Sequence, residues 1–392
     1  MMISEHEATT EILNAVRALP ARPLMLSRVL GCFAAEDYLA RLPLPVFDNS
    51  AMDGYAVVAR SAGKGARLAV TGEQPAGPDR RLRVSAGEAV RIFTGAPVPE
   101  GADAVVMQED VTREADEIVI NTDVESGEFI RSRGCDLAEA QKILSKGDRI
   151  GAAAAALLAS QGIAEVSVGG EVQVAILSTG DELVQPDGTL QPGQIYESNS
   201  TLLTGLAQRS GAAVTSIEHC RDDRKWLVDV IKRATQNDVL IISGGVSVGE
   251  HDLVKDALRD AGANIGIWRI AIKPGKPFLF GNVGNCAVFG LPGNPVSAFV
   301  TFLQFVRPAI LKMMGATEIS LPQVPAVLMI DLANDGDRPH YIRGKLERGQ
   351  FTPVGRQESH ALFGLSRSNS LLRLEIAESL KAGAHIQVQI WD

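Results

Sequence analysis

Lys273 and Lys276 flank a Pro-Gly pair. A turn of this kind can aim both ammonium groups at one point, and lysine is a compact point charge suited to an oxyanion. Two solvated loop lysines are the alternative interpretation. The apolar segments on either side, residues 266–272 and 277–281, favour a turn held between core elements. The segment therefore predicts an oxyanion-binding site.

Three glycine-containing loops follow predicted strands, at residues 179–182, 244–252 and 291–297. Glycine lets backbone N–H groups approach an anion, and a following helix N-terminus adds partial positive charge. Each loop alone could be a tight strand-to-helix turn. Together they predict a cradle for phosphate or another oxyanion. The residues that we predict to bind substrate there are Thr179, Gly180, Ser243, Gly244, Gly245, Ser247, Pro292, Gly293, Asn294 and Pro295.

Carboxylates in loops or at helix starts supply the other half of the predicted chemistry. Mg²⁺ takes oxygen ligands, keeps several waters and commonly bridges carboxylates to substrate phosphates. Two of these residues could instead be helix N-caps, Asp223 and Asp252, and Asp53-Gly54 could be a hairpin turn. The candidates are Asp53, Asp136, Asp181, Glu182, Asp223 and Asp252.

Composition and missing motifs exclude several classes of protein. The formal net charge of −9 leaves no global basic field for nucleic acid or an anionic membrane, so an anionic substrate needs a local pocket. The four cysteines form no C-x-x-C pair, which argues against a zinc ribbon and fits a reducing cytoplasm. The absence of H-E-x-x-H, G-x-S-x-G and Walker A sequences counts against zincin, α/β-hydrolase and P-loop interpretations.

Neither a targeting segment nor a membrane span is expected. The N-terminus lacks a basic region followed by an apolar one. The longest apolar run, residues 151–159, is about half the length that a membrane span needs, and we interpret it as a buried helix.

The first half of the chain predicts a β-rich insertion. A capping box of Ser4 and Glu7 opens a helix that is expected to run up to Pro20. Short apolar pieces separated by Gly/Pro turns then extend over residues 43–134, and a helix and a short strand return at 145–168. The β-rich piece therefore interrupts a first domain.

Regular alternation of strands and helices begins at Val172. It predicts a parallel sheet covered by helices on both faces, with ligands at the carboxyl ends of the strands. A last helix is expected to start at Asn294 as N-cap and to stop at Gly315. Five short strand candidates after about Leu321 predict a small β domain.

The predicted fold class is therefore α/β plus β. It combines a three-layer α/β domain, an inserted β-rich domain and a small C-terminal β-barrel-like domain. The predicted boundaries are residues 1–43 with 140–170, residues 44–139, residues 171–318 and residues 319–392.

Long segments of the chain, in order, resemble the MoeA family of molybdopterin molybdenumtransferases, which is related to the E domain of gephyrin. The resemblance covers nearly the whole chain, and its α/β domain is similar to molybdopterin-binding domains. The segments that carry it are residues 47–57, 91–101, 178–182, 243–252, 273–277 and 291–297.

The resemblance implies the last step of molybdenum cofactor synthesis. Molybdate would be inserted into adenylylated molybdopterin with Mg²⁺-dependent release of AMP. The family resemblance also implies a homodimer, whose cleft is shared between the α/β domain of one subunit and the inserted domain of the other. A MogA-type molybdopterin adenylyltransferase would be the donor.

Residue roles follow from the same resemblance. Asp53, Thr94, Gly95 and Asp136 would reach the cleft from the inserted domain. From the α/β side, carboxylates would act on pyrophosphate, Mg²⁺ or pterin, with Glu182 and Asp252 as metal ligands. The α/β carboxylates are Glu182, Asp223 and Asp252, and the molybdate-binding residues would be Lys273, Lys276, Ser297, Arg343 and Ser359.

Two alternatives remain open from the sequence. A gephyrin-like scaffold would use the fold for binding alone. The same fold could also insert tungstate, because the two oxyanions are nearly the same in size and charge.

Overall fold

The structure, a computed structural model, describes residues 2–246 and 253–391. The chain folds into two compact units. The β-rich unit, Asp37–Ser145 with Ala156–Ile163, interrupts the sequence of the large unit. The four-domain division stays a prediction. The large unit comprises Met1–Glu36, Lys146–Ala155 and Ala164–Asp392.

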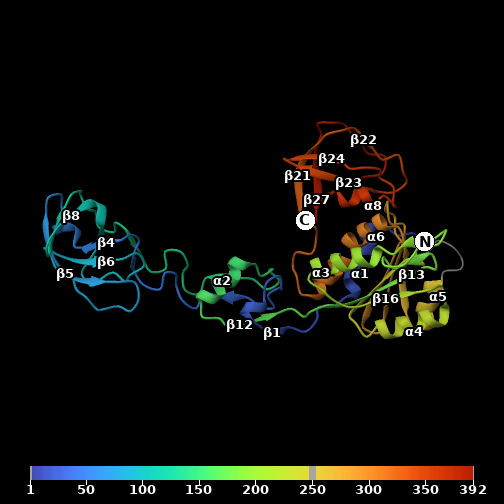
Figure 1. Cartoon of the computed structure of the whole chain (residues 1–392), viewed down its shortest axis with the longest axis horizontal. Coiled ribbons are helices and arrows are strands. Elements are labelled where there is room, and N and C mark those ends of the chain that lie inside the picture. Colours follow the sequence, from blue (N-terminus) through green and yellow to red (C-terminus); the bar gives the residue numbers. More distant parts are fainter. Residues whose placement is uncertain (1, 247–252, 392) are drawn as a thin grey trace. The chain divides into compact units, whose positions relative to one another are not determined.

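The β-rich unit is built on a six-stranded sheet in the order β7-β4-β6-β5-β9-β8 (Figure 1). Tyr55, Leu68 and Ile118 are buried together in its core. Two short pairs, β2 with β11 and β3 with β10, complete its strands. The elements are β2 (Tyr38–Leu39), β3 (Asn49–Ser50), β4 (Gly54–Val57), η2 (Ala59–Ser61), β5 (Arg67–Gln74), β6 (Glu88–Ile92), β7 (Ala104–Met107), η3 (Gln108–Asp110), β8 (Val111–Glu114), β9 (Glu117–Ile120), β10 (Ile130–Arg131) and β11 (Lys142–Leu144).

The large unit contains the α/β sheet, in the order β16-β13-β17-β20-β19-β18. The first four strands are parallel, as predicted, but the prediction of a wholly parallel sheet is wrong at β19, which runs antiparallel to both of its neighbours, β20 and β18. The connections before and after β19 are shorter than the dozen or so residues that a parallel crossover needs. The strands are β13 (Gln173–Thr179), β16 (Ala213–Cys220), β17 (Val239–Ser243), β18 (Asn264–Arg269), β19 (Pro277–Val283) and β20 (Cys286–Leu291).

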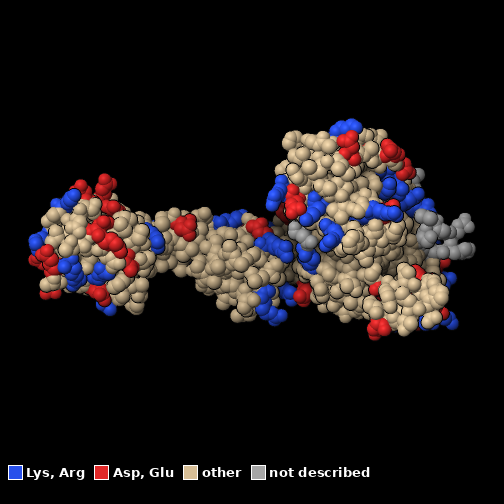
Figure 2. All heavy atoms as spheres, turned by 45° about the horizontal axis from the view of Figure 1, so that its top comes forward, with Lys and Arg blue, Asp and Glu red and all other residues tan. Residues whose placement is uncertain are grey.

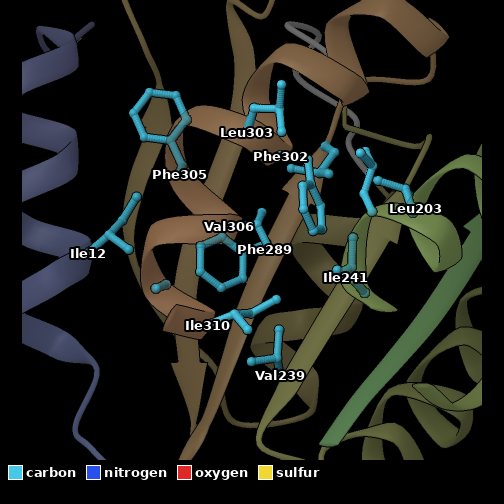
Figure 3. Packing of buried hydrophobic residues seen from close by; sticks show 14 of the residues in the cluster. Ile12, Leu203, Val239, Ile241, Phe289, Phe302, Leu303, Phe305, Val306 and Ile310 are labelled. Atoms are coloured by element: carbon cyan, nitrogen blue, oxygen red, sulfur yellow. The ribbon is translucent and has the colours of Figure 1, made fainter. Parts of the chain in front are cut away.

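Helices cover both faces of this sheet, which confirms the three-layer prediction (Figure 1). Because side chains alternate along a strand, Val239 and Ile241 pack on one face with Ile12 of α1, while Leu240 and Ile242 pack on the other (Figure 3). The first face is covered by α1 (Glu5–Ala15), α3 (Asn199–Arg209), α6 (Pro295–Thr301) and α7 (Arg307–Met313), and the second by α4 (Arg224–Ala234) and α5 (Leu253–Asp260).

The opening helix α1 has the predicted capping box, in which Ser4 Oγ accepts from the N–H of Glu7 at 3.2 Å. The helix ends at Ala15, short of the predicted Pro20. Val16 is extended, and the N–H of Leu19 instead donates to the carbonyl of Met313 at 2.8 Å.

The predicted last helix runs without a break over Pro295–Met313 and stops at Gly315, whose φ is +84°. Its middle is a π-helical segment, η4 (Phe302–Val306). This wider turn precedes Pro308, which has no N–H to continue the α-helical ladder. The helix is long and apolar enough to span a membrane, but 83% of it is buried, so it is a core helix.

The C-terminal strands close into a barrel in the order β21-β24-β23-β25-β27, which confirms the predicted small β domain. Apolar side chains such as Phe351 and Leu374 fill it. The elements are β21 (Gln323–Leu328), β22 (Leu332–Ala333), β23 (His340–Glu347), β24 (Gln350–Pro353), α8 (Leu362–Ser366), β25 (Ser370–Leu374), β26 (Ser379–Leu380) and β27 (His385–Ile390).

The apolar run at residues 151–159 forms α2 (Ala152–Ser160), but the prediction that this helix is buried is wrong. Leu158 is its only buried residue. Alanine favours a helix through propensity alone, so an alanine-rich run does not require a core around it. The remaining elements are β1 (Arg22–Met25), η1 (Leu26–Arg28), β12 (Glu165–Val168), β14 (Leu183–Val184) and β15 (Ile195–Tyr196).

Candidate functional site

The three glycine-containing loops meet in one pocket of about 680 Å³ at the carboxyl ends of β13, β17 and β20. Parallel strands place their carboxyl ends at one edge of the sheet, which explains the convergence. Ser247, like Asp252, lies outside the described residues. The predicted substrate-binding residues that line the pocket are Thr179, Gly180, Ser243, Gly244, Gly245, Pro292, Gly293, Asn294 and Pro295.

Glycine is required where the second loop crosses the first. Gly244 has a φ of +89°, and a Cβ on it would lie 2.5 Å from the carbonyl oxygen of Thr179. Gly245 has a φ of +65°, and its Cβ would lie 2.6 Å from Thr179 Oγ1. The two loops can approach this closely only without side chains at both positions.

Asn199, at the start of α3, is a pocket residue that sequence reasoning missed. Its Nδ2 donates to Ser243 Oγ at 2.8 Å and to the carbonyl of Gly293 at 2.7 Å, which fixes the orientation of the amide. Among the described residues, its Oδ1 is buried without a partner, and so is Thr179 Oγ1. A buried acceptor without a partner is costly, so these two oxygens are available to a ligand that carries N–H groups.

The acidic side of the pocket is formed by Glu182 and by Asp222, which sequence reasoning also missed. Burial raises the pKa of Asp222, and the charges of Asp181 and Glu182 raise it further. The neighbouring Asp223 caps α4, because its Oδ1 accepts from the N–H of Trp226 at 2.8 Å. Asp223 is therefore the N-cap of α4, as the alternative interpretation of this residue has it. A role of Asp223 in the reaction stays a prediction.

These carboxylates fit Mg²⁺ as that ion usually binds. No group of three or more His, Cys, Asp or Glu side chains within residues 2–246 and 253–391 is arranged to hold a metal alone. Mg²⁺ commonly uses one or two carboxylates together with substrate phosphates. The charges of Asp181 and Glu182 repel that of Asp222, and His219 offsets this repulsion only in part, so the position suits a cation.

The predicted lysine turn is attached to the start of β23. The N–H of Lys273 donates to the carbonyl of Pro339 at 2.9 Å, and its carbonyl accepts from the N–H of Tyr341 at 2.7 Å. Arg338 adds a bond from Nη1 to the carbonyl of Ile272 at 3.2 Å. Main-chain bonds therefore hold the turn, and the side chain of Lys273 is exposed.

Cationic side chains surround His340, which pairs with Lys273 through a β-bridge. His340 is 7% exposed, and its Nε2 has no partner among the described residues. Burial lowers its pKa to about 4, and the charges of Lys273, Arg343 and Arg338 contribute to this shift. His340 is therefore neutral at pH 7. Figure 2 shows Lys and Arg side chains along the visible junction of the barrel with the α/β layers.

Arg343 is fully buried and holds the loop that follows β24. Its guanidinium donates to the carbonyls of Arg356 and Glu358. Among the described residues its Nε is without a partner, and burial lowers its pKa. A contact of Arg343 with molybdate stays a prediction.

Ser359 in this loop contacts the third glycine-containing loop. Its Oγ accepts from Asn294 Nδ2 at 2.8 Å, and its carbonyl accepts from the N–H of Val296 at 3.1 Å. Asn294 stands at the predicted N-cap position of α6, but its side chain makes no capping bond because it donates to Ser359 instead. Ser297, one turn into α6, is buried.

The β-rich unit carries the other predicted site residues. Thr94 donates from its N–H and its Oγ1 to Asp53 Oδ1, each at 2.8 Å, and these bonds lower the pKa of Asp53. Gly95 has a φ of +81°, and Asp136 is exposed. The hairpin alternative for Asp53-Gly54 is wrong, because β3 pairs with β10 and β4 pairs with β6 and β7. Gly54 instead admits Val106, whose carbonyl oxygen would lie 1.9 Å from a Cβ.

Known protein families match this chain along nearly its whole length. The MoeA N-terminal region (domain I and II) matches residues 3–162, a probable molybdopterin binding domain matches 175–312, and the MoeA C-terminal region (domain IV) matches 325–391. The chain is 39% identical to a molybdopterin molybdenumtransferase of Haemophilus influenzae, over 90% of this chain and 89% of that protein. The chain belongs to the MoeA family.

Further relatives of this MoeA family chain agree over its full length. It is 36% identical to molybdopterin molybdenumtransferase 2 of Mycobacterium tuberculosis, over 100% of this chain and 99% of that one. The crystal structure of the molybdopterin biosynthesis MoeA protein from Pyrococcus horikoshii covers 100% of both chains with a TM-score of 0.86 and 29% identity. The predicted family is thus confirmed, and the chain is a molybdopterin molybdenumtransferase, an enzyme of molybdenum cofactor biosynthesis.

Proposed function

We propose that this enzyme inserts molybdate into adenylylated molybdopterin and releases AMP in a Mg²⁺-dependent step, the last of cofactor synthesis. The observation that carries the proposal is the single pocket in which three anion-cradling loops meet. An adenylylated substrate has a pyrophosphate that needs N–H donors and a pterin that needs acceptors for its own N–H groups. The pocket offers loop glycines for the first and Asn199 and Thr179 oxygens for the second.

Each group of residues has a separate task in this proposal. The backbone of Gly180, Gly244 and Gly293 would bind the pyrophosphate. Lys273 and Lys276 would neutralise the molybdate dianion, with Ser297 and Ser359 as hydroxyl donors. Arg343 would act by holding the Ser359 loop, which its bonds to the carbonyls of Arg356 and Glu358 support.

The carboxylates would serve the metal and the cleavage step. Glu182, with Asp252 from outside the described residues, would hold Mg²⁺, and Asp222 lies beside Glu182. When bound, Mg²⁺ supplies positive charge to the phosphate oxygens. Asp223 would orient α4 through its cap, and Asp53, Thr94, Gly95 and Asp136 would contribute from the β-rich unit.

We further propose that the enzyme works in the cytoplasm as a homodimer and receives adenylylated molybdopterin from a MogA-type adenylyltransferase. The family resemblance supports these three statements. Tungstate insertion is a second candidate, since lysine ammonium groups do not distinguish two dianions of nearly equal size. A scaffold role of the gephyrin type would not need the cradle and the cation cluster together.

The test is direct. Purified protein, adenylylated molybdopterin, Mg²⁺ and molybdate should release AMP and yield cofactor that activates a molybdoenzyme apoprotein. Omitting Mg²⁺ should stop AMP release. Absence of AMP release with a substrate that a known family member converts would falsify the proposal, and a competition between tungstate and molybdate would decide the oxyanion.

A further inference from the structure

A second cavity, of about 270 Å³, lies in the large unit where α3, α7 and the end of β27 come together. None of its lining residues lines the substrate pocket. Its wall is mixed, with apolar side chains and three arginines. The lining residues that matter here are Arg149, Arg209, Arg307, Leu206, Leu303 and Trp391.

Arg307 is a partly buried arginine of this cavity. Its Nη1 donates to the carbonyl of Ile319 at 2.8 Å, so one edge of the guanidinium is fixed in place. Burial lowers its pKa, and the positive charge of Arg149 lowers it further. Arg149 and Arg307 therefore bring two positive charges that repel each other to the wall of one cavity.

No carboxylate lines this cavity within residues 2–246 and 253–391. The neighbouring cavity, of about 310 Å³, shares Arg149 and is different, because Arg22 there lies 3.5 Å from Glu171. Arg209 is engaged in part, since its Nη2 donates to the carbonyl of Trp391 at 3.1 Å. The repulsion between Arg149 and Arg307 thus has no compensating acid in the described wall.

We propose that this cavity binds a tetrahedral oxyanion, such as inorganic phosphate or molybdate, between Arg149 and Arg307. A guanidinium presents a planar fork of donors, and two forks from different elements match an anion with oxygens on several sides. The site is separate from the proposed catalytic pocket, and it does not depend on the function proposed above.

Equilibrium dialysis tests the proposal with two ligands, inorganic phosphate and molybdate. Phosphate is measured on the full chain. Molybdate is measured on the Lys273→Ala/Lys276→Ala chain, so that the proposed catalytic site does not contribute. Arg149→Gln should weaken binding about tenfold, because a charged hydrogen-bonding partner is lost. Arg149 is exposed, so the fold should tolerate this change.

Two further variants make the result specific. Arg307→Lys keeps the charge but removes the fork, and it should also weaken binding about tenfold. Arg28→Gln removes the same charge from the neighbouring cavity and should change binding less than about twofold. Thermal unfolding without phosphate checks that each variant is folded. Binding of phosphate or of molybdate supports the proposal, and the comparison of the two shows which anion the cavity takes.

Two outcomes would overturn it. The full chain could show no saturable binding of phosphate while the Lys273→Ala/Lys276→Ala chain shows none of molybdate. Arg28→Gln could weaken binding as much as Arg149→Gln, which would mean that a diffuse field and no built site holds the anion.

Discussion

At the scale of single residues, Lys273 and Lys276 allow binding and folding to be separated. The Lys273 turn is held by main-chain bonds to Pro339 and Tyr341, which an alanine side chain leaves intact. We expect Lys273→Ala and Lys276→Ala each to weaken molybdate binding about tenfold, since a charged partner is lost. The free energy of unfolding should change by less than about 0.5 kcal/mol. Equilibrium dialysis and urea denaturation measure the two effects.

Lys345→Ala is the matched control, because Lys345 is an exposed lysine of the barrel that pairs with Glu347 at 3.0 Å. It should leave molybdate binding unchanged. If both turn variants lost several kcal/mol of stability and bound molybdate normally, the turn would be structural and the oxyanion assignment would be wrong.

His340 predicts a pH dependence of stability. Its pKa is lowered to about 4 in the folded chain by burial and by the neighbouring cations, so protonation favours the unfolded chain. Stability from this residue is full above the unfolded pKa of 6.5 and is lost as pH falls through 4. The shift corresponds to roughly 3 kcal/mol at most.

Urea denaturation of His340→Gln and wild type between pH 4 and 7 measures this loss. The stability of His340→Gln should fall less steeply below pH 6.5 than that of wild type. His385→Gln removes an exposed histidine and should follow the wild-type curve. Parallel curves for wild type and His340→Gln would show that His340 is protonated as easily in the folded chain as in the unfolded one.

Residue types predicted the loops and the lysine turn, but two pocket residues could not be found in this way. Asn199 is the first residue of α3, and nothing near it in sequence shows that its amide will meet Ser243 and Gly293. Asp222 and Asp223 are adjacent acids of the same type. Which one caps α4 and which one lines the pocket is decided by backbone geometry at the helix start.

At the scale of elements, helix α1 is joined to the barrel by a charged network. Glu5 accepts from Arg373 Nε at 2.9 Å and from the hydroxyl of Tyr341. The pKa of the Tyr341 hydroxyl is raised well above its usual value, by burial first and by Glu5 next. Tyr341 also bonds to the lysine turn through its N–H, so the network borders the predicted molybdate residues.

We therefore expect Glu5→Ala to destabilise the chain by about 2 kcal/mol, because the buried Tyr341 hydroxyl loses its acceptor and Arg373 keeps only its contact with Glu375. Urea denaturation measures the loss. Glu11→Ala, an exposed acid on the same helix, should cost less than about 0.5 kcal/mol. Equal effects of the two substitutions would mean that the network adds nothing beyond helix propensity.

Periodicity predicted most helices and strands of the α/β layers, because alternating burial on two faces leaves a clear pattern in the sequence. It did not give strand direction. The pattern of apolar residues in a strand does not show whether the strand runs parallel or antiparallel to its neighbours. Only the short connections around β19 indicate the antiparallel pairing at this end of the sheet. Periodicity also did not predict that α2 lies at the surface, because the hydropathy of an alanine-rich helix is the same in a core and at a surface.

At the scale of the whole molecule, the predicted site residues are divided between two compact units. Asp53 belongs to the β-rich unit and Lys273 to the large unit. Sequence patterns place residues along a chain and within a unit. They carry no information on which copy of the chain completes a site, and here that information comes from the family resemblance, which implies a homodimer with shared clefts.

Mixed dimers test this proposal. Asp53→Ala and Lys273→Ala should each be inactive in AMP release, whereas the two chains co-expressed should recover activity. In a mixed dimer with shared clefts, one cleft receives both substitutions and the other receives neither. Random pairing makes half of the dimers mixed, so about a quarter of wild-type activity should return, with each intact site acting independently. Chains that carry both substitutions should stay inactive in any mixture. If each site were formed within one chain, every site in the mixture would carry a substitution, and the co-expressed pair would be as inactive as either variant alone.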